Sequence, residues 1–120
     1  MSRDAREIEG LDEHFRGRDP ELQEIFDELV RRLRTLGPVK IDPVKTSINL
    51  AARHEFGAVT VRGNFFRLEF LAETRIADGR IVHIERQGPG KFAHSVVIES
   101  LADLDVVVMG WLAAAYRFGS

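Results

Sequence analysis

The sequence predicts an α+β domain: an antiparallel sheet of five to six strands, with an N-terminal and a C-terminal helix packed on one face. Three changes of pattern along the chain predict it. Apolar residues recur every three to four positions between residues 19 and 36, at every second position between 39 and 99, and almost without interruption after 100. A period near 3.6 is typical of amphipathic helices and a period of 2 is typical of half-buried strands. The order of elements is therefore helix, sheet, helix.

The first helix is predicted to begin at Asp19, which caps it, with Pro20 in its first turn, and to end at Gly37. Its buried stripe is predicted to consist of Leu22, Ile25, Phe26, Leu29, Val30, Leu33 and Leu36. We expect residues 1–18 to form a partly ordered arm with a short helix over 11–15. The domain itself is predicted over residues 19–120.

The sheet is predicted to contain strands over 46–53, 58–62, 65–72, 81–87 and 92–99, with a short sixth strand near 39–41. Val82 and Ile84 are expected on its apolar face. Three turn signals are predicted to connect neighbouring strands, and the second of them suits a type I′ turn. These signals are Gly63-Asn64, Asp78-Gly79 and Gly88-Pro89-Gly90.

The last helix is predicted to begin after Ser100 and to be apolar around most of its circumference. Its buried stripe is expected to contain Leu101, Leu104, Val107, Val108, Trp111, Leu112 and Tyr116. Because Val106, Met109 and the alanines at 113–115 leave almost no polar side, this helix needs cover from more than one layer. The pattern favours a homodimer.

Composition and charge exclude or disfavour several classes of function. The chain has 120 residues, 44% hydrophobic and 30% charged, as expected for one globular domain. It has no cysteine, which excludes thiolate chemistry and favours a cytoplasmic location. The longest apolar run, over 106–116, is shorter than the roughly 20 residues that cross a bilayer, so no membrane segment is expected. A net charge of −2 without a basic stripe disfavours nucleic acid as a partner.

Several short segments carry a resemblance to a known family. They are HFRG at 14–17, IFDELV at 25–30, LGPV at 36–39, PVKTSI at 43–48 and FGAVT at 56–60. In these the chain resembles an uncharacterised bacterial family, the domain of unknown function number 5655. The resemblance implies a helix–sheet–helix α+β domain. It implies no reaction, ligand or cofactor.

The polar face of the predicted sheet carries the candidate ligand-binding residues Lys45, Asn49, Arg53 and Arg67. Arg62 and several hydroxyl and alanine side chains lie between them in the pattern. Guanidinium groups pair with carboxylate or phosphate, so this face is suited to a small anionic ligand. Two other interpretations stay open. Acidic residues such as Glu69 can pair with the arginines across strands, and the apolar residues on this face also suit a protein partner.

His83 and His94 complete the candidate binding residues. His83 shares a strand face with Glu85, a spacing that suits a general base or a pair of solvated side chains. His94 lies on the side of Phe92 and Val96, as a core histidine or a contact in a pocket. There is no His-Glu-x-x-His pattern and no phosphate-loop spacing, so we expect no metal and no cofactor.

These observations predict a non-catalytic ligand-binding or protein-interaction module that uses the mixed polar face of its sheet. The alternative is a small enzyme that acts on an anionic metabolite, with His83 and Glu85, or His94, as acid and base.

Overall fold

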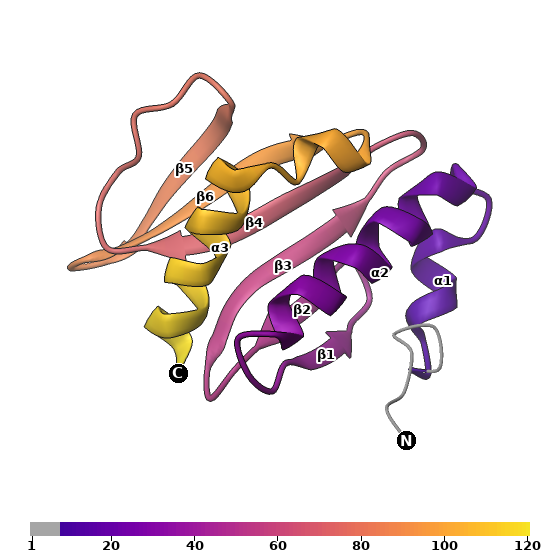
Figure 1. Cartoon of the computed structure of the whole chain (residues 1–120), viewed down its shortest axis with the longest axis horizontal. Coiled ribbons are helices and arrows are strands. Elements are labelled where there is room, and N and C mark those ends of the chain that lie inside the picture. Colours follow the sequence, from indigo (N-terminus) through magenta and orange to yellow (C-terminus); the bar gives the residue numbers. More distant parts are fainter. Residues whose placement is uncertain (1–7) are drawn as a thin grey trace.

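Six antiparallel strands form one sheet with the two long helices on a single face, so the predicted α+β fold is confirmed (Figure 1). The computed structural model describes residues 8–120. The strand order is β1-β2-β3-β4-β6-β5. The helices are α1 (Leu11–Phe15), α2 (Pro20–Arg34) and α3 (Val106–Gly119), with a 3-10 turn η2 (Leu101–Asp103). The strands are β1 (Lys40–Pro43), β2 (Ile48–Ala51), β3 (Glu55–Val61), β4 (Phe66–Ala72), β5 (Ile81–Gly88) and β6 (Lys91–Ile98).

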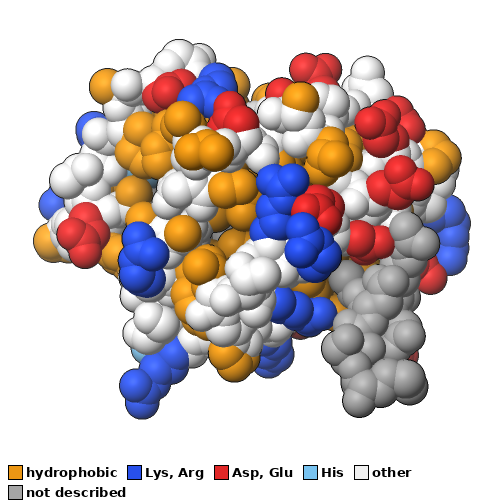
Figure 2. Space-filling view, in the orientation of Figure 1, with side chains coloured by type: hydrophobic (Ala, Val, Ile, Leu, Met, Phe, Trp, Pro, Cys, Tyr) orange, Lys and Arg blue, Asp and Glu red, His pale blue; other side chains and the backbone are white. Residues whose placement is uncertain are grey.

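The core lies between the helices and the sheet. Its largest side chains are Phe26 of α2, Phe56 of β3, and Phe66 and Phe70 of β4, all fully buried. Burying one such side chain stabilises a fold by roughly 1.5–3 kcal/mol. Figure 2 views the helix-bearing face, where hydrophobic side chains are frequent on the half that α3 occupies.

Helix α2 begins as predicted, because the Asp19 carboxylate accepts a hydrogen bond from the Glu21 N–H at 3.0 Å. Six of the seven residues predicted for its stripe are buried. The prediction for Leu36 is wrong, since this side chain is 43% exposed. The helix ends at Arg34, and the chain turns at Gly37 with a φ of 151°. The three- to four-residue spacing of apolar side chains therefore continues in the sequence beyond the last residue of the helix.

The predicted short helix at 11–15 is confirmed as α1. Leu11 and Phe15 are buried in the core, and the rings of Phe15 and Phe26 lie 5.4 Å apart. The boundary at residue 18 stays a prediction, and the first seven residues of the predicted arm lie outside the described part of the chain.

Strand β5 is where the sheet differs most from the prediction. Asp78-Gly79 does not form a hairpin between neighbouring strands, because β6 lies between β4 and β5. Gly79 also lacks the positive φ that a type I′ turn requires. Val82 was expected on the apolar face but is 55% exposed, since a bulge between Ile81 and His83 shifts the alternation and Ile81 packs against the core instead.

The other two predicted turns connect neighbouring strands. Arg62 N–H donates to the Phe65 carbonyl at 2.8 Å across the Gly63-Asn64 turn between β3 and β4. The β5–β6 turn pairs Gly88 with Lys91, and Gly90 adopts a φ of 64° there. The short sixth strand is β1.

The last helix begins later than predicted. Ser100 caps only η2, and the Asp105 carboxylate accepts a hydrogen bond from the Val108 N–H at 3.0 Å to start α3. The expectation that Leu101 and Val107 are buried is therefore wrong, since they are 47% and 45% exposed. Leu104, Val108, Leu112 and Tyr116 are buried as predicted. The homodimer stays a prediction, which a mass measurement in solution tests.

Gly57 allows β3 and β4 to lie close together. A Cβ at this position would lie 2.7 Å from the backbone carbonyl oxygen of Glu69. We predict that Gly57→Ala lowers the free energy of unfolding by about 1–3 kcal/mol, because backbone must move to relieve the overlap. Urea denaturation measures this. Gly79→Ala is the control, since nothing lies within 4 Å of its added Cβ, and an equal loss in both variants would contradict the prediction.

Glu28 holds two arginines of α2. Its carboxylate accepts hydrogen bonds from Arg31 and Arg32 at 2.6 Å each, and these bonds lower its pKa from 4.5 to about 2. Arg32 in turn donates to the Leu104 carbonyl at 2.7 Å, which ties α2 to the segment before α3.

We predict that Glu28→Gln lowers the free energy of unfolding at pH 7 by about 1 kcal/mol, a modest value because Arg31 is largely exposed. The folded pKa lies below the unfolded one, so this contribution is present above pH 4.5 and is lost as the pH falls toward 2. Denaturation of both proteins at pH 7, 4 and 3 measures the difference. A difference that stays constant with pH, or that Glu24→Gln reproduces, would contradict the prediction.

Candidate functional site

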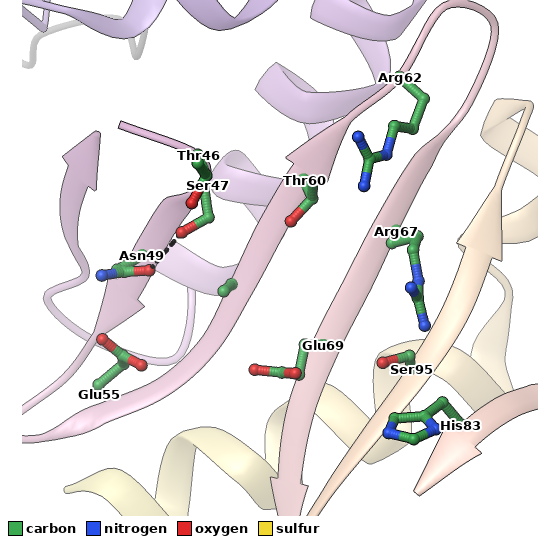
Figure 3. Close-up of a pocket in the computed structure, with 11 residues that line it drawn as sticks. Thr46, Ser47, Asn49, Glu55, Thr60, Arg62, Arg67, Glu69, His83 and Ser95 are labelled. Carbon is green, nitrogen blue, oxygen red and sulfur yellow. Dashed lines mark hydrogen bonds between the residues drawn. The ribbon is translucent and has the colours of Figure 1, made fainter. Parts of the chain in front are cut away.

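A polar groove crosses the face of the sheet opposite the helices (Figure 3). Its volume is about 330 Å³, and side chains from the β1–β2 connection and from five of the strands line it. They are Thr46, Ser47, Asn49, Glu55, Ala58, Thr60, Arg62, Arg67, Glu69, His83 and Ser95. The mixed face predicted from the alternation is therefore hollowed.

The pairing register explains the hollow. One cross-strand row runs Asn49, Ala58, Glu69, Ser95 and His83, in the strand order β2-β3-β4-β6-β5. Strands lie roughly 4.8 Å apart, so this row spans roughly 19 Å. The small side chains of Ala58 and Ser95 flank Glu69, and the larger Asn49 and His83 stand toward the ends. The floor of the groove is thus low where the residues are small.

One end of the groove is cationic. Thr60 of β3 pairs with Arg67 of β4, and Arg62 follows β3 two residues after Thr60. Figure 3 shows Arg62 beside the β3–β4 turn and the Arg67 side chain reaching from β4 toward Ser95. Within residues 8–120, no carboxylate oxygen lies within 4 Å of either guanidinium group. Their donors are therefore available to a bound anion.

The other end is acidic. Burial raises the pKa of the Glu69 carboxyl, and the neighbouring carboxylates of Glu85 and Glu55 raise it further. Arg67 and His83 act in the opposite direction with smaller effect. Glu69 is therefore held beside like charges and is partly withdrawn from water. Such a carboxyl in a groove is a candidate for contact with a ligand.

The candidate residues do not all meet in the groove. Asn49, Arg67 and His83 line it. Lys45 and Arg53 are exposed in the connections on either side of β2 and do not line it. The strand predicted over 46–53 covers only Ile48–Ala51, so Arg53 lies beyond its end.

His94 lies on the other face of the sheet, in the core. Its ring stacks on Phe70 with centroids 5.4 Å apart, and its Nε2 accepts a hydrogen bond from the Ile76 N–H at 2.9 Å. Nδ1 lies 3.2 Å from the Phe92 carbonyl oxygen, which suits an N–H donor at that nitrogen. His94 therefore has the environment of a core histidine and does not share the groove with His83.

Glu55 and Thr46 line the groove but were not among the predicted residues. The β2–β3 pairing shifts register between Leu50 and Ala51, and this irregularity turns Glu55 toward the polar face while Phe56 enters the core. Simple alternation along the sequence contains no signal for such a shift.

A comparison with protein families identifies the domain. The family model described as Domain of unknown function (DUF5655) matches residues 11–119. The chain belongs to this family. No curated protein and no solved structure matches the sequence. The matched part of this DUF5655 domain includes α1 and every residue that lines the groove.

Residues 8–120 of the DUF5655 domain contain neither a cluster of metal ligands nor a helix that could span a membrane. No group of three or more metal-ligating His, Cys, Asp or Glu side chains occurs there. In the same range, none of the helices is both long and apolar enough to cross a bilayer. The groove is the candidate site chosen for this DUF5655 domain because two arginines and two glutamates line it together.

The buried His94 makes stability depend on pH. Burial lowers its pKa below the usual 6.5, Arg75 lowers it further, and the Phe92 carbonyl opposes this. The folded state thus resists protonation, so stability is fully present above pH 6.5 and falls as the pH drops below that value.

We predict that the wild-type DUF5655 domain loses more stability between pH 8 and pH 5.5 than His94→Gln does. Urea denaturation at both pH values measures the loss. His54→Gln, which changes an exposed residue in the β2–β3 connection, should keep the wild-type dependence. An unchanged pH dependence in His94→Gln would contradict the assignment of the neutral ring.

Proposed function

We propose that this domain is a non-catalytic ligand-binding module that holds the carboxylate or phosphate group of a small molecule in the groove. The observation that carries this function is the pair of guanidinium groups, Arg62 and Arg67, that line one groove without a carboxylate within 4 Å among residues 8–120. Charge-assisted bonds from arginine to carboxylate or phosphate are among the stronger hydrogen bonds in proteins.

Further features of the groove support a small molecule as the occupant. Its volume of about 330 Å³ lies at the lower end of the range for small-molecule sites, roughly 300–1,000 Å³. The hydroxyl groups of Ser47, Thr60 and Ser95 also line the groove. A hydroxyl hydrogen can rotate toward a bound acceptor, so these groups add hydrogen-bond donors to those of the arginines. Ser47 Oγ already donates to Asn49 Oδ1 at 3.1 Å, which orders the β2 side.

We predict that inorganic phosphate or succinate raises the melting temperature of the wild-type protein, because a ligand of the folded state stabilises it. Arg67→Ala and Arg62→Ala should each weaken binding about tenfold or more in calorimetric titrations, as expected for the loss of a hydrogen bond to a charged group. Their melting temperatures without ligand should stay near that of the wild type.

Arg53→Ala is the matched control, since this arginine is exposed in the β2–β3 connection and does not line the groove. It should bind anions as the wild type does. Equal weakening in all three variants would indicate general electrostatic attraction and would contradict a site at Arg62 and Arg67. Loss of fold in the groove variants would make these arginines structural.

A second candidate is a small enzyme that acts on an anionic metabolite, with His83 and Glu85 as acid and base. One contact favours it: His83 lines the groove, and its Nε2 lies 3.8 Å from Glu85 Oε2. His94 has no part in it, because its ring lies in the core. Incubating a bound anion with the protein and recording NMR spectra tests this candidate. New ligand resonances that are absent with His83→Ala would support catalysis. A ligand spectrum that stays unchanged would contradict the enzyme candidate.

A further inference from the structure

The groove contains equal numbers of positive and negative side chains. Arg62 and Arg67 contribute two positive charges, and Glu55 and Glu69 contribute two negative charges. Among the described residues none of these four forms an ion pair within 4 Å with another of them. A purely anionic ligand would compensate the arginines only and would leave the two carboxylates repelling it.

The two kinds of charge are separated along the strands. Arg67 and Glu69 lie two residues apart on the same face of β4, a separation of roughly 7 Å along the strand. Arg62 extends the positive end toward the β3–β4 turn, whereas Glu55 begins β3 at the opposite end. Figure 3 shows Arg62 and Glu55 at opposite ends of the groove, with Arg67 and Glu69 between them.

The acidic end is electrostatically unfavourable when it is empty of cations. Glu69 is half-buried, and Glu85 and Glu55 add like charge to its surroundings. A cationic group bound near Glu69 would replace this repulsion with attraction. The small side chains of Ala58 and Ser95 on either side of Glu69 leave space for such a cation beside the carboxylate.

Resting on the proposed function, we infer that the ligand is a zwitterion: a phosphate or carboxylate held by Arg62 and Arg67, joined by a short chain to an ammonium group held by Glu69 and Glu55. The groove is neutral overall, as is a carboxylate ligand of this kind, whereas a phosphate ligand with one ammonium group keeps a net charge of about −1. In both, each charged end of the ligand meets the opposite charge.

Matched pairs of probes that differ by one amine test this inference. Ethyl phosphate is compared with phosphoethanolamine, and butyrate with 4-aminobutyrate, by calorimetric titration at pH 8. We expect the amine to strengthen binding about five- to tenfold within at least one pair, as for a charge pair that is partly withdrawn from water. The two pairs distinguish a phosphate end from a carboxylate end.

Glu69→Gln should remove the advantage of the amine and should leave ethyl phosphate or butyrate bound as well as before, or more tightly. Glu55→Gln provides a second variant should Glu69→Gln fail to fold, which circular dichroism checks. Glu73→Gln is the matched control, because Glu73 is exposed and does not line this groove. It should keep the advantage.

The outcomes separate the two proposals. Equal binding of both members in each pair would overturn the zwitterion and leave the anion site in place. The same amine advantage in Glu69→Gln and Glu55→Gln would also overturn it. If none of the four probes binds, or if Arg67→Ala binds them as the wild type does, the proposed function fails together with the inference.

Discussion

The pairing register of β4 with β3 and β6 is the constraint on which both the core and the groove depend. The side chains of Phe66, Leu68 and Phe70 point into the core between the sheet and the helices. Those of Arg67 and Glu69 point to the opposite face of the same strand. Because side chains alternate along a strand, a slip of one residue would bury the charges and expose the aromatic rings. Core packing therefore also fixes which charged groups enter the groove.

The helices stabilise the sheet from one side and leave its polar face open. Tyr116 of α3 donates to the Pro38 carbonyl at 3.0 Å, and its ring packs against Phe56. Trp111 stacks on Phe70, which in turn stacks on His94. These contacts stabilise the central strands from the helix-bearing face. The opposite face can therefore carry unpaired charges that contribute little to packing. Such charges are suited to binding.

Irregularities in the sheet shape the site as much as its regular pairing does. The shift between Leu50 and Ala51 brings Glu55 to the groove, whereas the bulge after Ile81 lets Ile81 pair with Val96 and leaves Val82 exposed. Without the first, the acidic end would contain Glu69 as its only lining carboxylate in the described chain.

The sequence by itself determined the helix–sheet–helix order, the cap and stripe of α2, and the alternation that separates Arg67 from Leu68, because these depend on neighbours a few residues apart. Only the tertiary structure decided that β6 lies between β4 and β5, that Arg53 falls outside the groove, and that His94 lies in the core. The exposure of Leu36, Val82 and Val107 belongs with these. Strand order, bulges and helix ends depend on pairing and packing between segments far apart in the chain, which local periodicity does not encode.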